Sequence, residues 1–306
     1  TVLAGISVLS LLLGTAITVI LSGNIVRPVN ALSTAMQRVA NGDYDVKLET
    51  KSNFEIIRRV YSDFNHMVDE LNAVETLRND FVSNVSHEFK TPLSSIEGYA
   101  MLLQDESLSA EARSEYTERI VVSTRRLSTL VSNILMITKI ENQTMPFTLS
   151  SYRVDEQVRQ SILLLENKWS EKNIGFEMDM DSIEFCAVEG LLGNVWSNLI
   201  DNAIKFSPEG EIIYISLKEK DDMLSFKIAN RGEPMSGETL KRIFEKFYQG
   251  DTSHKREGNG LGLALVKKIV RVHGGSVSAV NTEDGLIEFT VNLPAKRSCE
   301  RCCGSN

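Results

Sequence analysis

Apolar residues divide the chain into an unbroken N-terminal run and a longer body with periodic patterns. Residues 2–21 carry no charge, and a helix of that length spans about 30 Å, the thickness of a bilayer core. Arg27, Arg38 and Lys47 follow the run, and positive charge on that side predicts a cytoplasmic location for everything downstream. We therefore expect a transmembrane helix at 1–22. A buried helix and a signal peptide are the alternatives, although the basic start of a signal peptide is missing.

Helical periodicity continues in the next third of the chain. Two short amphipathic patterns, ending near Ala40 and Leu71, are separated by Asn41-Gly42-Asp43 and a short extended piece at 44–48. Two long patterns follow at about 74–104 and 110–141. Short helices with narrow apolar stripes do not bury themselves alone, so we expect an all-α linker at 23–75. A helical hairpin at 76–143 would form a four-helix bundle in a dimer.

The pattern changes near residue 147. Helical stretches at 153–172, 188–206 and 261–272 are interleaved with strand patterns at 176–180, 212–217, 224–229, 276–280 and 286–293. This mixture predicts a separate α/β domain at 147–296, with helices packed on one face of a sheet. The last residues, 297–306, are expected to be a disordered, reduced tail that contains cysteines.

The helix around His87 presents that side chain to solvent. With Val85 at zero and about 100° per residue, His87 falls near 200° and Thr91 near 240°, opposite the apolar face. An exposed neutral imidazole is a competent nucleophile, and the neighbouring Glu88 carboxylate can hold its other ring N–H. Pro92 removes one backbone bond and is expected to bend the helix.

Two other patterns suit phosphate chemistry. Asn198, Asn202 and Lys205 share one helix face, and amide oxygens can ligate Mg²⁺ while lysine meets phosphate. Gly258, Gly260 and Gly262 precede a helix, where backbone N–H groups approach phosphates. The loop fits neither a Walker A nor a dinucleotide-binding pattern.

These motifs resemble those of sensor histidine kinases. Residues 23–73 resemble a HAMP linker through Arg27-Pro28, Ala40 to Asp43 and Phe64 to Met67, but depart from that family at Phe54 to Ile57. Ser86 to Leu93 resembles the phosphoacceptor box. The resemblance implies that His87 is phosphorylated, that Glu88 acts as general base or orienter, and that Thr91 positions water during dephosphorylation of a partner.

The C-terminal domain resembles the ATP-binding domain of the GHKL fold, an α+β sandwich. The resemblance assigns Asn198, Asn202 and Lys205 to the N box, with Asn202 as the Mg²⁺ ligand. It assigns Phe244 and Phe247 to the F box and Gly258, Gly260, Leu261 and Gly262 to the G2 box. Residues 250–257 would form the lid, with Lys255 and Arg256 meeting phosphates.

The adenine box departs from the family pattern. Asn230 stands where the family has Asp, Gly232 is kept, and Pro234 replaces a second Gly. An amide accepts a neutral rather than a charged hydrogen bond, which predicts roughly tenfold weaker ATP binding. The glycine-threonine pair before the final strand is also missing at Asp284 to Ile287.

Charge excludes one class of partner. The 306 residues carry 33 Lys+Arg and 41 Asp+Glu, a net charge of −8, which argues against nucleic acid as a partner. The resemblance implies a membrane-bound histidine kinase of the bacterial cytoplasmic membrane that uses ATP and Mg²⁺. Its expected partners are a second copy, membrane lipid and the receiver domain of a response regulator. A scaffold without ATP use, a chemoreceptor, and an ATPase without phosphohistidine are the alternatives.

Overall fold

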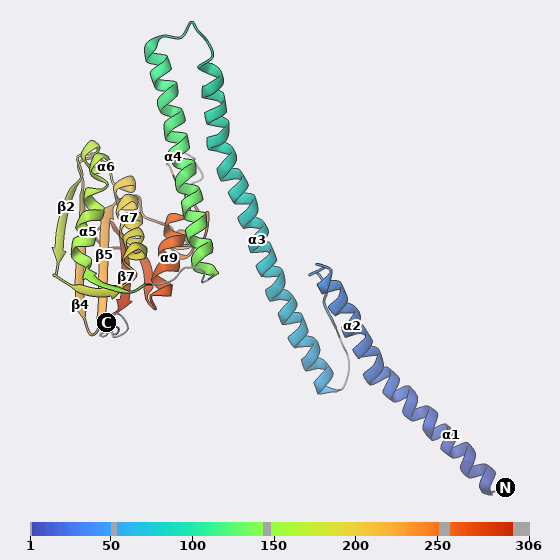
Figure 1. Ribbon diagram of the computed structural model, residues 1–306. Helices are drawn as coiled ribbons and strands as arrows, with labels where there is room; N and C mark the ends of the chain where they lie inside the picture. Colours follow the sequence, from blue (N-terminus) through green and yellow to red (C-terminus); the bar gives the residue numbers. More distant parts are fainter. Residues whose placement is uncertain (1, 50–53, 143–147, 251–257, 296–306) are drawn as a thin grey trace, which may run out of the picture. The chain divides into compact units, whose positions relative to one another are not determined.

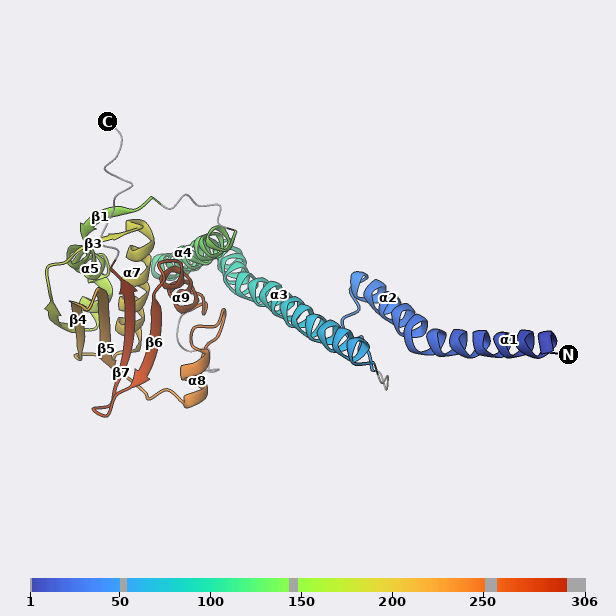
Figure 2. The same ribbon diagram turned by 90° about the horizontal axis from the view of Figure 1, so that it is seen from below.

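The structure is a computed structural model that describes residues 2–49, 54–142, 148–250 and 258–295. The chain divides into two compact units, 1–85 and 86–306, and each is described by itself. Figures 1 and 2 show the elements in two views.

The first unit begins with one uninterrupted helical rod. Helix α1 (Val2–Leu21) passes through a π-helical turn (Ser22–Val26) into α2 (Arg27–Ala40), which begins at Arg27 with Pro28 in its first turn. The ring of Pro28 would clash with the Asn24 carbonyl in a regular α-helix. The π turn widens the helix at this point, and the Arg27 N–H donates to the Ser22 carbonyl five residues back.

Helix α2 packs on the first part of α3 (Glu55–Leu102) around a small core that includes Val39, Phe64 and Val68. The expected extended piece at 44–48 is present but belongs to no sheet in the described residues. Its backbone is paired instead by one side chain, because Asn65 accepts from the Leu48 N–H and donates to the Leu48 carbonyl, both at 2.9 Å. The Phe64-Asn65 pair therefore supplies both packing and backbone pairing.

Helix α3 is a single helix of 48 residues, so the predicted boundary near Ala73 is absent. The segment Leu71 to Glu75 contains neither Gly nor Pro, and nothing local stops the helix there. Helical structure also continues through Pro92. At that position the Thr91 hydroxyl donates to the His87 carbonyl at 3.4 Å, in the turn where proline lacks an N–H.

The hairpin of the second unit follows the sequence prediction closely. Helix α4 (Ala110–Glu141) starts at the expected residue, and the Ser109 hydroxyl caps it by accepting from the Ala112 N–H at 3.2 Å. Tyr99 of α3 and Tyr116 of α4 join the two helices, with their ring centroids 5.5 Å apart. Figure 1 shows α4 running beside the end of α3.

The α/β part is built on a five-stranded sheet in the order β2-β4-β5-β7-β6. Its strands are β2 (Gly175–Met180), β4 (Ile212–Lys220), β5 (Met223–Arg231), β6 (Ser276–Asn281) and β7 (Leu286–Pro294). Only the β2–β4 pair is parallel among these strands. Figure 2 shows α5 (Val154–Leu163), α7 (Glu189–Phe206) and α9 (Gly262–Val272) on one side of it.

Burial confirms the predicted layering. The alternate residues of β4, β5 and β7 that face the helices are buried, and Trp196 of α7 meets Phe226 of β5 at a ring distance of 4.7 Å. Helices α7 and α9 lie against each other on this face. The sheet therefore fixes the two helices that carry the predicted phosphate-binding residues.

Several short elements differ from the prediction. The expected helix at 153–172 is two helices, α5 and α6 (Glu166–Glu171), because the Ile162 carbonyl accepts from both the Leu165 N–H and the Trp169 indole. The sequence analysis did not predict the two-stranded ladder of β1 (Ser150–Arg153) and β3 (Glu184–Ala187). It also did not predict helix α8 (Gly237–Arg242). Cys186 of β3 is half-buried and disulfide-bonded.

Candidate phosphoacceptor and nucleotide site

His87 lies on the exposed side of α3, as the helical periodicity predicted. Glu88 and Phe89 next to it are half-buried, and Thr91 is exposed. The His87 ring makes no hydrogen bond or ion pair with any residue that the structure describes. Both ring nitrogens are therefore accessible to an incoming group, and Glu88 is the nearest carboxylate in sequence.

The amide face of α7 is presented away from the core. Leu199 and Ile200 are fully buried on one side, whereas Asn198, Asn202 and Lys205 are half-buried on the other. The Asn198 amide nitrogen donates to the Asn194 carbonyl one turn back at 2.7 Å. The side-chain oxygen of Asn198 faces Gly262 at the start of α9.

The glycine loop lies directly against this face. A Cβ on Gly262 would stand 2.6 Å from Asn198 Oδ1, and a Cβ on Gly258 would stand 2.8 Å from Lys205 Nζ. Both distances are shorter than real Cβ contacts, so a side chain at either position would have to displace the end of the Asn198 or Lys205 side chain. The loop and α7 form a cradle of amide, ammonium and backbone N–H groups at the start of α9, a suitable environment for phosphate.

The aromatic box is joined to the same loop. The Phe247 N–H donates to the Gly260 carbonyl at 2.9 Å, and Gly260 adopts a φ of +64°. Phe247 itself has a φ of 62°, which is costly for an aromatic residue. Phe244 meets Phe289 of β7 edge-on at 6.3 Å. The strained turn is thus held between the sheet and the glycine loop.

Asn230 is buried at the end of β5, with 2% of its surface exposed. Its amide nitrogen donates to the Arg231 carbonyl at 3.1 Å, so its oxygen is the group left for an incoming donor. A Cβ on Gly232 would stand 3.5 Å from the Phe206 carbonyl. The end of α7 therefore reaches the predicted adenine box as well as the glycine loop.

The sequence missed two residues that shape the site. Gln249 donates to the Gly258 carbonyl at 2.9 Å, and Asn281 of β6 pairs with both backbone groups of Met235 in the loop after Gly232. Gln249 lies two residues after Phe247, and this position is the sequence feature that could have indicated its role. Lys255 and Arg256, predicted to meet phosphates, lie outside the described residues.

The donor set suits Mg²⁺ held together with phosphate. Asn202 makes no side-chain hydrogen bond within the described residues, and its neutral amide oxygen is a hard donor. In the described ranges no group of three or more His, Cys, Asp or Glu could hold a metal by itself. A cation here would need the oxygens of a bound phosphate to complete its coordination.

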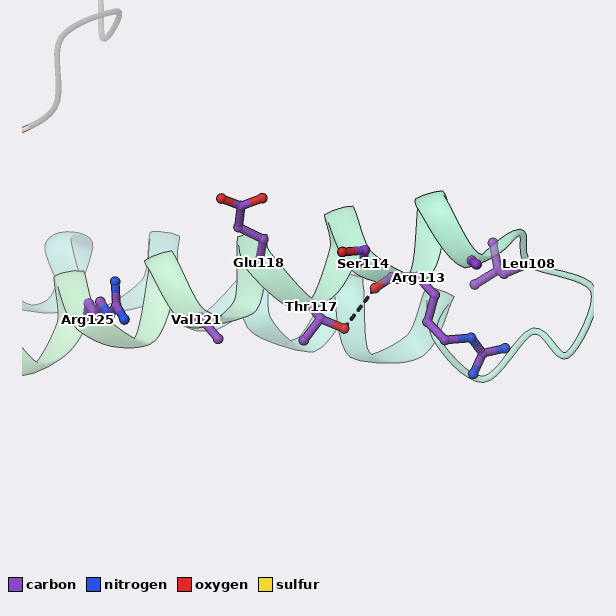
Figure 3. A pocket seen from close by; sticks show the side chains of 8 residues that line it. Leu108, Arg113, Ser114, Thr117, Glu118, Val121 and Arg125 are labelled. Atoms are coloured by element: carbon purple, nitrogen blue, oxygen red, sulfur yellow. Dashed lines mark hydrogen bonds between the residues drawn. The ribbon is translucent and has the colours of Figure 1, made fainter. Parts of the chain in front are cut away.

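A separate groove of about 810 Å³ runs along the hairpin (Figure 3). It is open to solvent, and among its lining residues the Thr117 hydroxyl donates to the Arg113 carbonyl at 2.8 Å. None of the nucleotide-site residues named above lines it; the lining residues are Leu108, Ala110, Arg113, Ser114, Thr117, Glu118, Val121 and Arg125. It is a surface of α4 rather than part of the phosphate cradle.

An α/β layer of this topology, with a glycine loop set against an amide-bearing helix, defines the class of ATPases shared by histidine kinases, DNA gyrase B and Hsp90. Residues 187–297 match that family, described as "Histidine kinase-, DNA gyrase B-, and HSP90-like ATPase". Residues 77–143 match the His Kinase A (phospho-acceptor) domain, and residues 20–73 match the HAMP domain. The chain belongs to the sensor histidine kinases of two-component systems.

Individual relatives agree with this assignment. The chain is 32% identical over 294 residues to the heme sensor protein HssS of Staphylococcus aureus strain JH9. That match covers 96% of this chain and 64% of the relative's length. Full-length ShkA in complex with AMPPNP is 27% identical with a TM-score of 0.54, covering 72% of this chain and 46% of ShkA. AdeS of Acinetobacter baumannii shares the fold, with a TM-score of 0.57 at 22% identity, covering 69% of this chain and 98% of AdeS.

Proposed function

We propose that this chain transfers the γ-phosphoryl group of ATP to His87 and then to an aspartate of a response regulator. The observation that carries the proposal is the fit between α7 and the glycine loop, where the oxygen of Asn198 occupies the space that any side chain at position 262 would need. An amide face and a glycine loop held this closely bring carboxamide, ammonium and backbone N–H groups together, and these are groups that bind phosphate. ShkA, a relative of similar fold, has been solved with AMPPNP.

In the first step, a ring nitrogen of His87 attacks the γ-phosphorus in line. One N–P bond forms, the bond from phosphorus to the β–γ bridging oxygen breaks, and ADP leaves with that electron pair. Glu88 is positioned beside His87 in sequence to hold the other ring N–H and to raise the basicity of the imidazole. The exposure of His87 on α3 is compatible with both the donor and the later acceptor aspartate approaching it.

We propose that the phosphates are held by Asn198, Asn202, Lys205 and the Gly258–Gly262 loop. Mg²⁺, when bound by Asn202 together with the phosphates, supplies neutralisation of charge on the transferring group. The Asn230 oxygen is proposed to accept from the adenine amino group, with Gly232, Phe244, Phe247 and Leu261 shaping the surrounding pocket. Lys255 and Arg256 are proposed as further phosphate contacts.

The proposed partners are a second copy of the chain and a receiver domain. The hairpin exposes apolar side chains that a second hairpin would bury, including Leu93, Met101, Val121 and Leu135. The matched phospho-acceptor domain supports the same arrangement. Thr91, one turn from His87, is proposed to position water when the protein dephosphorylates its regulator.

The proposed location is the cell membrane, with residues after the first helix in the cytoplasm. Two helices of the described residues, within Gly5–Ala40 and Ala110–Glu141, are long and apolar enough to cross a bilayer. We assign only the first as a span at 1–22, because α4 carries many charged residues. The further proposed divisions are a HAMP linker at 23–75, a phosphotransfer domain at 76–143, a catalytic domain at 147–296 and a tail at 297–306.

The test is autophosphorylation of the purified chain in lipid nanodiscs with γ-labelled ATP. We expect an acid-labile, base-stable phosphoprotein in the wild type and no label in His87→Gln. His66→Gln is the matched control, because His66 is an exposed helical histidine of the same α3. Equal labelling of H87Q and wild type would remove the assignment of His87. Nucleotide binding without any label would instead favour an ATPase without phosphohistidine, and a lack of nucleotide binding would favour a scaffold.

A further inference from the structure

The end of α7 is held by a lysine from another helix. Lys172 follows α6 directly and is half-buried. Its Nζ donates to the carbonyls of Ile204 and Lys205, each at 2.9 Å, and to that of Ser207 at 3.0 Å. A lysine ammonium carries three N–H donors, so this one group is fully used by the last turn of α7.

This contact suits the electrostatics of a helix end. The last carbonyls of an α-helix have no partner within the helix and carry partial negative charge, so a cation there is favourable. The backbone of Lys172 is also engaged, because its carbonyl accepts from the Gly210 N–H at 2.9 Å. Lys172 thus ties both α7 and the loop that follows it to the turn after α6.

The held turn is the part of α7 that reaches the nucleotide site. Lys205, whose carbonyl Lys172 holds, places its own Nζ 2.8 Å from the position of a Cβ on Gly258. Phe206, between the held carbonyls, places its backbone oxygen 3.5 Å from the position of a Cβ on Gly232. A shift of this turn would therefore change the phosphate and adenine ends of the cradle together.

We propose that Lys172 is a positioning residue for ATP, which fixes the last turn of α7 so that Lys205 and the adenine box keep their spacing. The proposal rests on the proposed function, in that the α7 face is taken as the nucleotide site. Lys172 itself touches no nucleotide in this proposal. It acts through the backbone of residues 204–207, so its loss should affect nucleotide affinity more than the chemical step.

A neighbouring lysine provides a matched control. Lys168 of α6 bonds to Asp201 of α7 at 2.5 Å, so it links the same two helices. That ion pair joins two exposed side chains, with 59% and 41% of their surfaces accessible, and exposed pairs contribute little. Lys168→Met removes a lysine–α7 contact without touching the helix end.

The experiment compares wild type, Lys172→Met, Lys172→Arg and Lys168→Met in nanodiscs. We measure AMPPNP affinity by calorimetry, KM and kcat of autophosphorylation, and hydrogen exchange of residues 204–211. For K172M we expect Kd and KM to rise about tenfold, kcat to change less than about twofold, and exchange at 204–211 to accelerate. K172R should recover part of the affinity because it restores charge and donors, and K168M should match wild type.

The outcomes separate the two proposals. A wild type that binds no AMPPNP overturns the proposed function and, with it, the role of Lys172. A wild type that binds AMPPNP while K172M binds equally well overturns the role of Lys172 alone, as does an equal loss in K168M. If thermal unfolding shows that K172M is not folded, Lys172→Gln, which keeps donors without charge, takes its place under the same criteria.

Discussion

The carbonyl oxygen of Asn198 fills the space next to Gly262 so completely that a Cβ on that glycine would stand 2.6 Å away. Gly262→Ala must therefore displace the Asn198 amide or the start of α9. Overpacking of this kind costs about 1–3 kcal/mol, and we expect nucleotide affinity to fall about tenfold or more. Calorimetry with AMPPNP measures it. The control is Gly190→Ala in the first turn of α7, where a Cβ meets nothing within 4 Å; this variant should bind AMPPNP like wild type. If G262A binds AMPPNP as tightly as wild type, the cradle does not hold the nucleotide.

Replacing Asn230 with aspartate, the residue typical of the family, should increase nucleotide affinity. The increase should be smaller than the roughly tenfold expected from the charge alone. A carboxylate at position 230 could accept a stronger bond from adenine, but it could not donate to the Arg231 carbonyl 3.1 Å away. We expect N230D to bind AMPPNP more tightly than wild type, by less than about tenfold. Asn230→Leu, which removes the acceptor, should bind more weakly. Tighter binding by N230L would exclude Asn230 as the adenine acceptor.

Acid should weaken the α/β domain through Asp155. Its fully buried carboxylate accepts from Arg153 at 2.6 and 2.8 Å, from Arg159 at 2.7 Å and from the Ile183 N–H. The Arg153 bonds, with Arg159 and Ile183 adding to them and burial opposing them, hold the pKa of Asp155 below its ordinary value. A lowered pKa in the folded state adds stability above the unfolded pKa near 3.9, and that stability is lost as pH falls toward the folded pKa.

Urea unfolding of D155N measures this contribution. Breaking a buried ion pair costs about 3 kcal/mol or more, so we expect a lower unfolding midpoint at pH 7 and a difference from wild type that narrows at about pH 3. Glu156→Gln is the control, because Glu156 bonds to Arg159 from an exposed position and should change stability by less than about 1 kcal/mol. A difference independent of pH would show that the ionised carboxylate is not the source.

Sequence patterns predicted the elements whose burial is regular. Strand β7 alternates buried and half-buried residues along its whole length, and α4 was placed within its observed bounds. The wrong boundaries fall where tertiary context replaces local signals. No glycine or proline marks an end near Ala73, and α3 continues through it. The four-residue ladder of β1 and β3 is too short for periodicity to detect.

The candidate site divides in the same way. Helical spacing of three polar residues made it possible to predict Asn198, Asn202 and Lys205 from the sequence. The clustering of glycines made it possible to predict the glycine loop. The contacts of Gln249 and Lys172 depend on segments that meet only after folding. Their residue types are ordinary for a surface, so no local pattern marks them.

The π turn at Ser22–Val26 has a geometric consequence for everything after the apolar helix. A π turn contains about one residue more than an α turn, which rotates the downstream side chains by about 100° relative to an uninterrupted α-helix. These five residues therefore determine the direction, about the helix axis, in which the buried face of α2 with Ala35 and Val39 points. Because the rod contains no loop, torsion or axial movement of the apolar segment is transmitted to that face directly.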